Sequence, residues 1–564
     1  MYEIMNEYSG PEQLMTWDDK KLQKMCTELR WTFINYCAKH GGHLASNLAT
    51  IELTVMAYAT GLVSFDRPLC FDAAHCTYTH KCLTGRWSWF VDETKQHLLH
   101  PTLATVESNA DLFNMAMIGS CGTLNGIALV DKQRPVILIG DGSLGNGVLM
   151  QALNVMSQFV KPVIIFNDNG QALVENVGGI YQHGPEKLLQ AMNYTCVGEV
   201  DGYDLPALRS VFNAAQGTTG AVYVHVHTKK GKGFAAAEND PVGWHWVNRF
   251  KIIDHDAPED DAVQVMNVVA DVVAHAPDDV YAVNAGLADT GLTFVKNELA
   301  DRYVEVGIAE EQAAYTAVGL ALRGKRPVIG THAMYATRMV TALTDMLLIN
   351  ANKDGSVPSV TILAHDVGVN THNYLQMGLM DTQVLGNIPG CTVISPATLD
   401  ELRTTLTYTL SGNHGLTLYR IPVGLEYGDN QVDDTWVTIK TGKSNVCVLV
   451  VGLMGIVALR GLKDVDVTVV RMLVVNDKTV AKRVRELTQK YTAFVIVEDG
   501  YIVGGLGARV ALALAEHNVR VKVLGLKRVN YATMEPQDDN LVLRENGYDD
   551  EAVRHQVVQY MEVS

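Results

Sequence analysis

The sequence contains no run of 18 apolar residues, no CxxC pair and no excess of basic residues. A membrane-spanning helix needs about 20 consecutive apolar residues, so no span is predicted. The nine cysteines are scattered, which predicts reduced thiols rather than a disulfide framework. Lys and Arg total 45 against 62 for Asp and Glu, giving a net charge of −17. This balance argues against binding to nucleic acid or to an anionic membrane surface.

The N-terminal stretch MYEIMNEYSGPEQL also lacks the basic start and apolar core of a signal peptide, so we expect a cytosolic protein. What the chain does have is length and an ordinary globular composition. It contains 564 residues, of which 48% are hydrophobic and 48 are glycine. At about 150 residues per domain, this length predicts three or four domains.

Short β-branched runs such as VILIG, VYAVNAG and AFVIVED alternate with helix-like stretches along the whole chain. Continuous apolar strands separated by helices are typical of parallel sheets covered on both faces. We therefore predict an α/β protein of three doubly wound domains with mostly parallel sheets. The acidic, proline-containing segment IIDHDAPEDDA indicates a linker. The predicted boundaries are a first domain at 1–250, a linker at 251–275, a second domain at 276–428 and a third at 440–564.

Polar residues follow two apolar runs of the first block. Asp141 comes directly after VILIG, and Asn169 comes after a second run that ends in Asn-Asp-Asn. The carboxyl ends of parallel strands meet at one edge of a sheet, so these two side chains can converge. Glycines between 142 and 147 let the backbone approach a ligand, and free N–H groups at the next helix N-terminus would suit a phosphate. Oxygen ligands of this kind suit Mg²⁺, although a lone Gly-Asp-Gly is more often a simple turn.

Taken together, the Gly-Asp-Gly and Asn-Asp-Asn stretches resemble the thiamine diphosphate signature. The resemblance implies that Asp141, Asn169 and the carbonyl of Gln171 hold Mg²⁺, and that Lys230 contacts the diphosphate. Thiamine chemistry also needs a carboxyl group against the pyrimidine ring of the cofactor. Glu310, in the stretch VGIAE, matches the pyrimidine-binding motif of the transketolase group. The simpler alternative is that Glu310 is a first-turn helix acid favoured by the helix dipole.

Longer segments resemble the 1-deoxy-D-xylulose-5-phosphate synthase family, in order and over nearly the whole chain. They include HGGHLASNLATIELTVMAYA, DAAHCTYTHKCLTGR, ENVGGIYQ, HTKKGKGF, ENDPVGWH, VEDGYIVGGLG and LRENGYDDE. The resemblance implies a transketolase-like thiamine diphosphate fold with a transketolase C-terminal domain, assembled as a homodimer. It also implies that pyruvate is decarboxylated and its two-carbon unit joined to an aldehyde. In the family this aldehyde is D-glyceraldehyde 3-phosphate, and the products are 1-deoxy-D-xylulose 5-phosphate and CO₂.

The resemblance assigns site residues by position, although each histidine taken alone is more often structural. The implied catalytic residues are His43, His75, His245, Glu310 and His372. The implied cofactor-binding residues are His75, Gly119, Ser120, Cys121, Gly140, Asp141, Gly142, Ser143, Asn169, Lys230, Glu310 and Tyr335. The implied substrate-binding residues are His43, Arg338, His372 and Arg420. An apolar pocket would raise the pKa of Glu310 and keep its proton shared with the cofactor.

The chain departs from the family pattern mainly in the part that binds the acceptor. Ser120 replaces a histidine, and Asn370 stands where the family has an acidic hydroxyl-binding residue. Asp366 and Val423 occupy positions of arginines that would grip a phosphate by paired, charge-assisted bonds. The segment after Gly179 is shorter than in typical members.

These departures leave several functions open. Other groups, such as His332 or Arg420, would bind the acceptor phosphate, or the acceptor is a different aldehyde. A transketolase-like enzyme that moves a two-carbon ketol between sugars is a second possibility. A relative that binds thiamine diphosphate without catalysis is a third.

Overall fold

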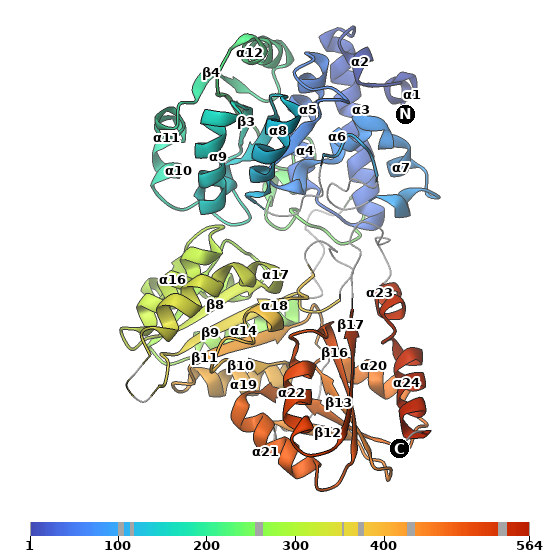
Figure 1. The fold of residues 1–564 in the computed structure, drawn as a ribbon. Helices are drawn as coiled ribbons and strands as arrows, with labels where there is room; N and C mark the ends of the chain where they lie inside the picture. The colour runs from blue at the N-terminus through green and yellow to red at the C-terminus, as the bar shows by residue number, and fades with distance from the viewer. Residues whose placement is uncertain are drawn as a thin grey trace. The chain divides into compact units, whose positions relative to one another are not determined.

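The computed structural model describes residues 2–99, 107–112, 118–253, 263–351, 353, 355–369, 377–425, 435–527 and 539–562. The chain divides into two compact units. Unit 1 comprises Met1–Asp260 with Gly307–Ala309, and unit 2 comprises Asp261–Val306 with Glu310–Ser564. The described strands form three sheets, one in unit 1 and two in unit 2 (Figure 1).

The sheet of unit 1 is parallel throughout, with the strand order β1-β2-β3-β5-β4. Its strands are β1 (Leu69–Phe71), β2 (Val136–Gly140), β3 (Val163–Asp168), β4 (Thr195–Asp201) and β5 (Val222–His227). Because side chains alternate between faces, each apolar strand serves two cores. On β2, Val136 and Leu138 join one core cluster, whereas Ile137 and Ile139 join another.

Helices cover both faces of this sheet, as a doubly wound fold requires. One core cluster contains residues of α3 (Asp19–His40), α5 (Ile51–Ala59) and α12 (Leu205–Gly217). The other contains residues of α8 (Leu124–Asp131), α9 (Gly147–Phe159) and α11 (Glu186–Ala191). The remaining α-helices of unit 1 are α1 (Glu3–Glu7), α2 (Pro11–Leu14), α4 (Ala45–Ala49), α6 (Tyr78–Lys81), α7 (Trp87–Val91), α10 (Gly179–His183) and α13 (Ala235–Asn239).

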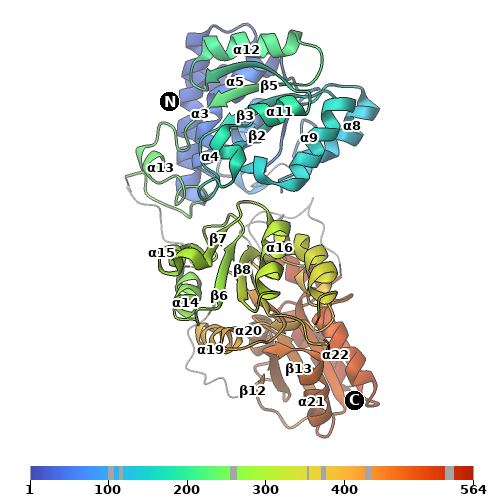
Figure 2. The same ribbon diagram turned by 90° about the vertical axis from the view of Figure 1, so that its left-hand side faces the viewer.

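The larger sheet of unit 2 has the order β15-β10-β11-β9-β8-β6-β7, and only β15 runs antiparallel to its neighbour among the described strands. The strands are β6 (Val280–Asn284), β7 (Tyr303–Glu305), β8 (Arg326–His332), β9 (Val360–His365), β10 (Thr392–Ile394), β11 (Leu416–Ile421) and β15 (Val474–Val475). Figure 2 shows α14 (Val263–Ala274) and α15 (Lys296–Leu299) on one side of this sheet and α16 (Glu310–Ala321) on the other. Two further helices, α17 (Ala333–Ala336) and α18 (Asp381–Val384), are short, and α19 (Leu399–Leu410) packs against α14.

The second sheet of unit 2 has the order β12-β14-β13-β16-β17, with β12 antiparallel to β14. Its strands are β12 (Trp436–Lys440), β13 (Val446–Val451), β14 (Thr468–Met472), β16 (Ala493–Tyr501) and β17 (Arg520–Leu526). In Figure 1, α22 (Leu506–Ala515) lies on one side and α20 (Met454–Gly461) with α24 (Asp550–Glu562) on the other. The other helices are α21 (Asp477–Leu487) and α23 (Asp539–Asn546). All three sheets therefore have the predicted doubly wound, mostly parallel architecture.

The structure differs from the sequence-based domain limits in two places. Residues 263–274, which we assigned to the linker, form α14, and its buried valines pack into the core of unit 2. We therefore extended the predicted linker too far. The apolar residues at 263–274 recur with the period of a buried helix, and this pattern marks the start of the second domain better than the acidic composition of the preceding segment does. Strand β15 comes from the predicted third domain but pairs with β10 of the larger sheet, and both blocks belong to one compact unit.

Two sequence-based expectations concern the chain as a whole. None of the described helices has the length and apolar character that crossing a bilayer demands. All nine cysteines are free thiols, and most are buried, with Cys196 exposed. This agrees with the prediction of reduced, core-packed cysteines.

Candidate functional site

The predicted metal ligands of unit 1 lie at the ends of two neighbouring strands. β2 ends at Gly140 and pairs in parallel with β3, where Gly140 lies opposite Asn167. Asp141 begins a 3-10 turn directly after β2, and its carboxylate is buried and accepts a hydrogen bond from Asn176 at 2.7 Å. The side-chain oxygen of Asn169 is buried without a hydrogen-bond partner among the described residues.

These residues fit a divalent cation with oxygen ligands. A buried amide oxygen without a partner is costly unless a ligand satisfies it. Burial, followed by the nearby Asp168 carboxylate, raises the pKa of Asp141. A bound cation would oppose both effects, because its positive charge stabilises the ionised carboxylate. The backbone is also tightly packed here, because a Cβ at Gly142 would lie 2.6 Å from that of Ala172. The carbonyl of Gln171, the third predicted ligand, belongs to a residue that pairs with Glu175 in an isolated bridge.

The helix N-terminus after this turn differs from our expectation. We expected free N–H groups at the start of α9 to bind a phosphate. Instead, Asn146 caps the helix, and its side-chain oxygen accepts from the N–H groups of Val148 and Leu149 at 3.0 and 3.3 Å. The 3-10 turn at Asp141–Gly145 separates the strand from the helix, so the glycine-rich stretch precedes the N-terminus of α9 and most of it lies outside the helix.

Among the three clustered lysines, Lys230 alone is buried. Its ammonium donates to the carbonyl of Ala172, and burial lowers its pKa to about 8, an effect that Asp141 opposes. Lys229 forms an ion pair with Glu238 at 2.6 Å, and Lys232 lies over the ring of Tyr203. Lys230 therefore lies beside the loop that carries Asn169 and Gln171, close enough to Asp141 for the two charges to interact.

The segment around Gly119 is organised by Asp72, a residue that sequence reasoning missed. Gly119 has a positive φ of 87° and donates its N–H to the Asp72 carboxylate at 2.8 Å. The Ser120 hydroxyl contacts the Asp72 carbonyl at 3.4 Å, and Cys121 and Ser143 are buried nearby. Burial raises the pKa of Asp72. Its signal was present in the sequence, because Asp72 directly follows β1 just as Asp141 follows β2.

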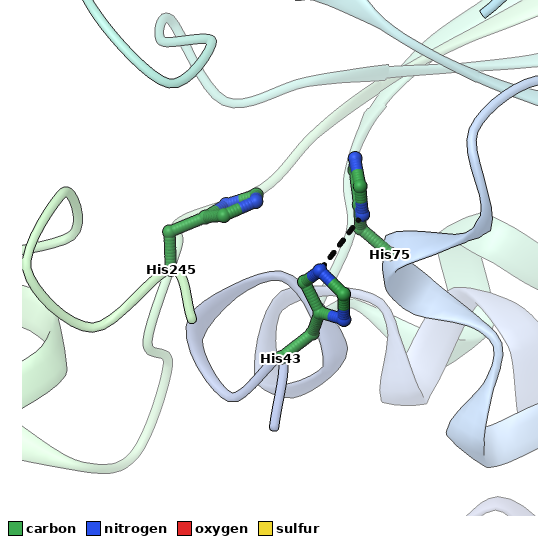
Figure 3. Close-up of side chains that lie close together, drawn as sticks. All are labelled: His43, His75 and His245. Atoms are coloured by element: carbon green, nitrogen blue, oxygen red, sulfur yellow. Dashed lines mark hydrogen bonds between the residues drawn. The ribbon is translucent and has the colours of Figure 1, made fainter. Parts of the chain in front are cut away.

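Three predicted histidines come together in unit 1 from separate segments, as Figure 3 shows. His43 Nε2 lies 3.1 Å from His75 Nδ1. The His245 ring lies 5.4 Å from that of His43 and 5.0 Å from that of His75, measured between centroids. One nitrogen from each ring falls within 4.8 Å of the others.

Burial lowers the pKa of all three histidines, so their rings are neutral near pH 7. For His75 the pKa falls to about 4, with the Lys230 charge adding to the effect of burial. For His43 and His245 it lies well below the usual value, because burial dominates and neighbouring histidines add to it. Neutral imidazoles can accept or pass on a proton at a reacting centre.

Asn47 fixes two of these histidines, and sequence reasoning missed it. Its amide donates to the carbonyls of His43 and His75 at 2.6 and 2.8 Å, and its oxygen accepts from the N–H of Tyr78 at 2.9 Å. Asn47 is fully buried in the short helix α4. A lone amide in the apolar stretch HLASNLAT was the signal that could have found it.

In unit 2, Glu310 begins α16 and is 2% exposed. Burial raises its pKa, as expected, and the Arg338 charge opposes this effect. Arg338, predicted to bind substrate, donates to the Glu310 carboxylate at 3.2 Å. Tyr335 lies half-buried one helical turn before Arg338, and its ring is stacked on that of His332 at 5.9 Å.

His332 is a cation held by carboxylates. Its Nε2 lies 2.9 Å from Asp289, and its Nδ1 lies 3.5 Å from Asp366. Burial alone would lower the pKa of His332, but Asp289 and then Asp366 raise it to about 10. Asp366 has a positive φ of 58°, an uncommon conformation for a residue other than glycine. At the position expected for a family arginine, the chain thus carries an acid that pairs with a histidine.

Arg420, predicted to bind substrate, is not presented to a ligand. Its guanidinium is 2% exposed and donates to Asp381 at 2.6 Å and to Asp499 at 2.7 Å. This buried ion-pair cluster joins the two sheets of unit 2, which is a structural role. Val423 is half-buried, and Asn370 and His372 lie outside the described residues.

Comparisons with known proteins find relatives over nearly the whole chain. Residues 5–185 match the family profile of 1-deoxy-D-xylulose-5-phosphate synthase, and residues 261–420 match that of the transketolase pyrimidine binding domain. The chain is 26% identical to the 1-deoxy-D-xylulose-5-phosphate synthase of Lachnoclostridium phytofermentans, with 98% of each chain covered. It is 28% identical to that of Nitrosospira multiformis, with 99% of each covered.

Among solved structures, the chain is similar to a transketolase from Campylobacter jejuni, with 13% identity, a TM-score of 0.43, and 96% and 100% of the two chains covered. It is also similar to a split-gene transketolase described as an inactive β4 tetramer, with 20% identity and a TM-score of 0.45. That match covers 54% of this chain and 98% of the other. The two family profiles and the relatives of nearly full length together show a transketolase-like transferase that is similar to 1-deoxy-D-xylulose-5-phosphate synthases over nearly its whole length.

Proposed function

We propose that this chain is a thiamine diphosphate-dependent carboligase that decarboxylates pyruvate and joins the two-carbon unit to an aldehyde. The observation that carries the proposal is the pair formed by the buried Asp141 carboxylate and the unpartnered Asn169 oxygen. They follow adjacent parallel strands, in a chain that also matches a pyrimidine-binding domain at 261–420. Oxygen ligands at one sheet edge support a Mg²⁺–diphosphate anchor.

The cofactor roles follow from these contacts. Asp141, Asn169 and the Gln171 carbonyl would hold Mg²⁺, and Lys230 would neutralise a diphosphate oxygen. At pH 7 the Lys230 ammonium stays largely protonated, because its pKa is about 8. Bound thiamine diphosphate supplies an electron sink for the electron pair released when a 2-keto acid loses CO₂.

The proton-handling roles fall to one acid and three neutral bases. Glu310 would hold a proton against the pyrimidine ring, which its burial and raised pKa support. His43, His75 and His245 would accept and return protons at the reacting carbons, which their neutral rings support. His372 stays a prediction in this set. We also propose the homodimer that the family resemblance implies.

The identity of the acceptor aldehyde is a separate part of the proposed function. In the family the acceptor carries a phosphate and the product would be 1-deoxy-D-xylulose 5-phosphate. In this chain the arginines that would bind this phosphate form ion pairs with carboxylates instead. Arg338 pairs with Glu310, and Arg420 is enclosed by two carboxylates. Asp366, beside the His332 cation, repels an anion. These contacts favour the alternative of an aldehyde without a phosphate.

The test is a pair of matched aldehydes. The enzyme, with Mg²⁺, thiamine diphosphate and pyruvate, is given glyceraldehyde or glyceraldehyde 3-phosphate, and the ketol is identified by mass. We expect comparable turnover for the two, or faster turnover of the free aldehyde. A preference of a hundredfold or more for the phosphate would contradict the acceptor assignment. Ketol transfer from a sugar without pyruvate-dependent CO₂ release would instead identify a transketolase.

A further inference from the structure

The carboxyl end of the unit 1 sheet carries a second group of metal-ligating side chains, separate from Asp141 and Asn169. His225 and His227 are two residues apart on β5, so both side chains point to the same face of the sheet. β5 lies between β3 and β4. In the strand register, Asp168 of β3 lies opposite His227, and Glu199 of β4 lies opposite His225. The sheet itself thus brings two histidines and two carboxylates together.

The spacing of three of these groups suits one metal ion. His225 Nε2 lies 2.8 Å from Asp168 Oδ2, and His227 Nδ1 lies 4.0 Å from the same oxygen. A ligand atom from each of the three residues lies within 4.8 Å of the others. Ligands placed about 2.0–2.1 Å from a tetrahedral ion are separated by about 3.3 Å, a value that the two measured distances bracket.

The two histidines differ in burial, and a further carboxylate lies behind the more exposed one. His225 is buried, with a side chain 8% exposed, and its Nε2 is the nitrogen that faces Asp168. The second ring nitrogen of His227, Nε2, contacts Glu199 Oε1 at 2.6 Å. A carboxylate behind a histidine in this way fixes the ring and its tautomer, as it does behind metal-bound histidines. Glu186 lies within 4.8 Å of Glu199 and His225 and adds negative charge.

We propose that Asp168, His225 and His227 form a site for a divalent transition metal of the Zn²⁺ class, with Glu199 positioning His227. Two imidazoles and one carboxylate are preferred by such metals and leave coordination positions for water. The Asp141 and Asn169 pair offers oxygens alone and suits Mg²⁺. The metal would tie the ends of β3 and β5 together beside that pair, and would stabilise unit 1 against unfolding.

The test uses the full-length protein, stripped of metals and then saturated with Mg²⁺ and thiamine diphosphate. Zn²⁺ binding is measured by calorimetry, and Co²⁺ binding by its visible absorption bands. We expect one equivalent to bind, with the affinity lost in His227→Ala and reduced about 10- to 100-fold in Glu199→Gln. Zn²⁺ should also raise the unfolding temperature of the wild type but not that of His227→Ala.

The matched control is His275→Ala. His275 is 81% exposed and pairs with Asp271 at 3.2 Å, but it belongs to none of the metal-ligating groups found among the described residues. Its replacement should leave binding unchanged. His227 is 48% exposed, so its replacement should preserve the fold, which circular dichroism checks. The proposal fails if no stoichiometric binding occurs, or if His227→Ala binds as the wild type does. It also fails if binding disappears only in His75→Ala, since the metal would then belong to the His43, His75 and His245 cluster.

Discussion

Buried histidines in the two units are held in opposite protonation states. In unit 1, His75 faces His43, His245 and the Lys230 charge, and its pKa falls to about 4. In unit 2, the buried His332 lies between Asp289 and Asp366, and its pKa rises to about 10. Burial lowers the pKa in both places, so the neighbouring charges decide the outcome. Unit 1 thus presents neutral bases, and unit 2 presents a cation that is already paired.

The contrast extends to the acid that begins α16. Glu310 lies in the unit with the paired charges, yet burial still raises its pKa because Arg338 only partly offsets the loss of solvation. A carboxyl group whose pKa is raised shares a proton with a bound ring more readily than Asp289, whose pKa the His332 charge lowers to about 2 against the effect of partial burial. The same unit therefore holds one acid suited to proton exchange and another suited to charge pairing.

The largest expected effect comes from removing the exchangeable proton. Glu310→Gln should lower pyruvate-dependent CO₂ release by about 10²- to 10⁴-fold, the usual contribution of a positioned acid or base. The fold and the unfolding temperature should change little. Glu311→Gln, the next residue in the same helical turn, is the matched control and should retain activity. Equal activity in both variants would remove Glu310 from the proposed chemistry.

A smaller effect on activity is expected from replacing Asn47, which holds the backbone of His43 and His75 in place. Asn47→Asp replaces two N–H donors with a carboxylate that faces the carbonyls of His43 and His75. Each buried group left without a partner costs about 1–3 kcal/mol, so unit 1 should unfold at a lower temperature and CO₂ release should fall. Asn154→Asp, at an exposed position of α9, serves as the control. If both variants unfold at the same temperature, Asn47 does not have this positioning role.

His332→Gln should remove the cation of the unit 2 cluster and cost about 1–2 kcal/mol, since Asp289 is 41% exposed and solvent screens part of the interaction. The pKa of His332 is higher in the folded than in the unfolded state, so its contribution is complete below about pH 6.5 and disappears as the pH rises through about 10. The stability difference between wild type and variant, measured by urea unfolding, should shrink over that range. A difference that grows with pH would show that His332 is neutral.

The smallest effect concerns the pH dependence of unit 1. Because His75 gains a proton only near pH 4, its NMR signals should not titrate between pH 5.5 and 8. A midpoint for His75 between pH 6 and 7 would contradict the neutral-base assignment.

The sequence predicts the elements of the fold well because buried parallel strands have a distinct composition. It also predicts which residues follow the strand ends, as for Asp141 and Asn169. It does not predict the partners of charged side chains. Arg420 has the same appearance in the sequence whether it faces a ligand or, as found, Asp381 and Asp499.

Partners contributed by distant segments were missed for the same reason. Asp72 organises Gly119 through a contact that spans 47 residues, and Asn47 contacts His75 across 28 residues. The cap at Asn146 was missed because the 3-10 turn shifts the start of α9 away from the glycine-rich stretch.

CO₂ release from carboxyl-labelled pyruvate is the decisive measurement for the proposed carboligase. We expect release that requires both thiamine diphosphate and Mg²⁺, stops when the metal is chelated, and is lost in Asp141→Ala. Asp141→Ala should still bind thiamine alone as weakly as the wild type does. If thiamine diphosphate and Mg²⁺ bind but no CO₂ is released from pyruvate or any other 2-keto acid, the chain is not a thiamine-dependent decarboxylating carboligase.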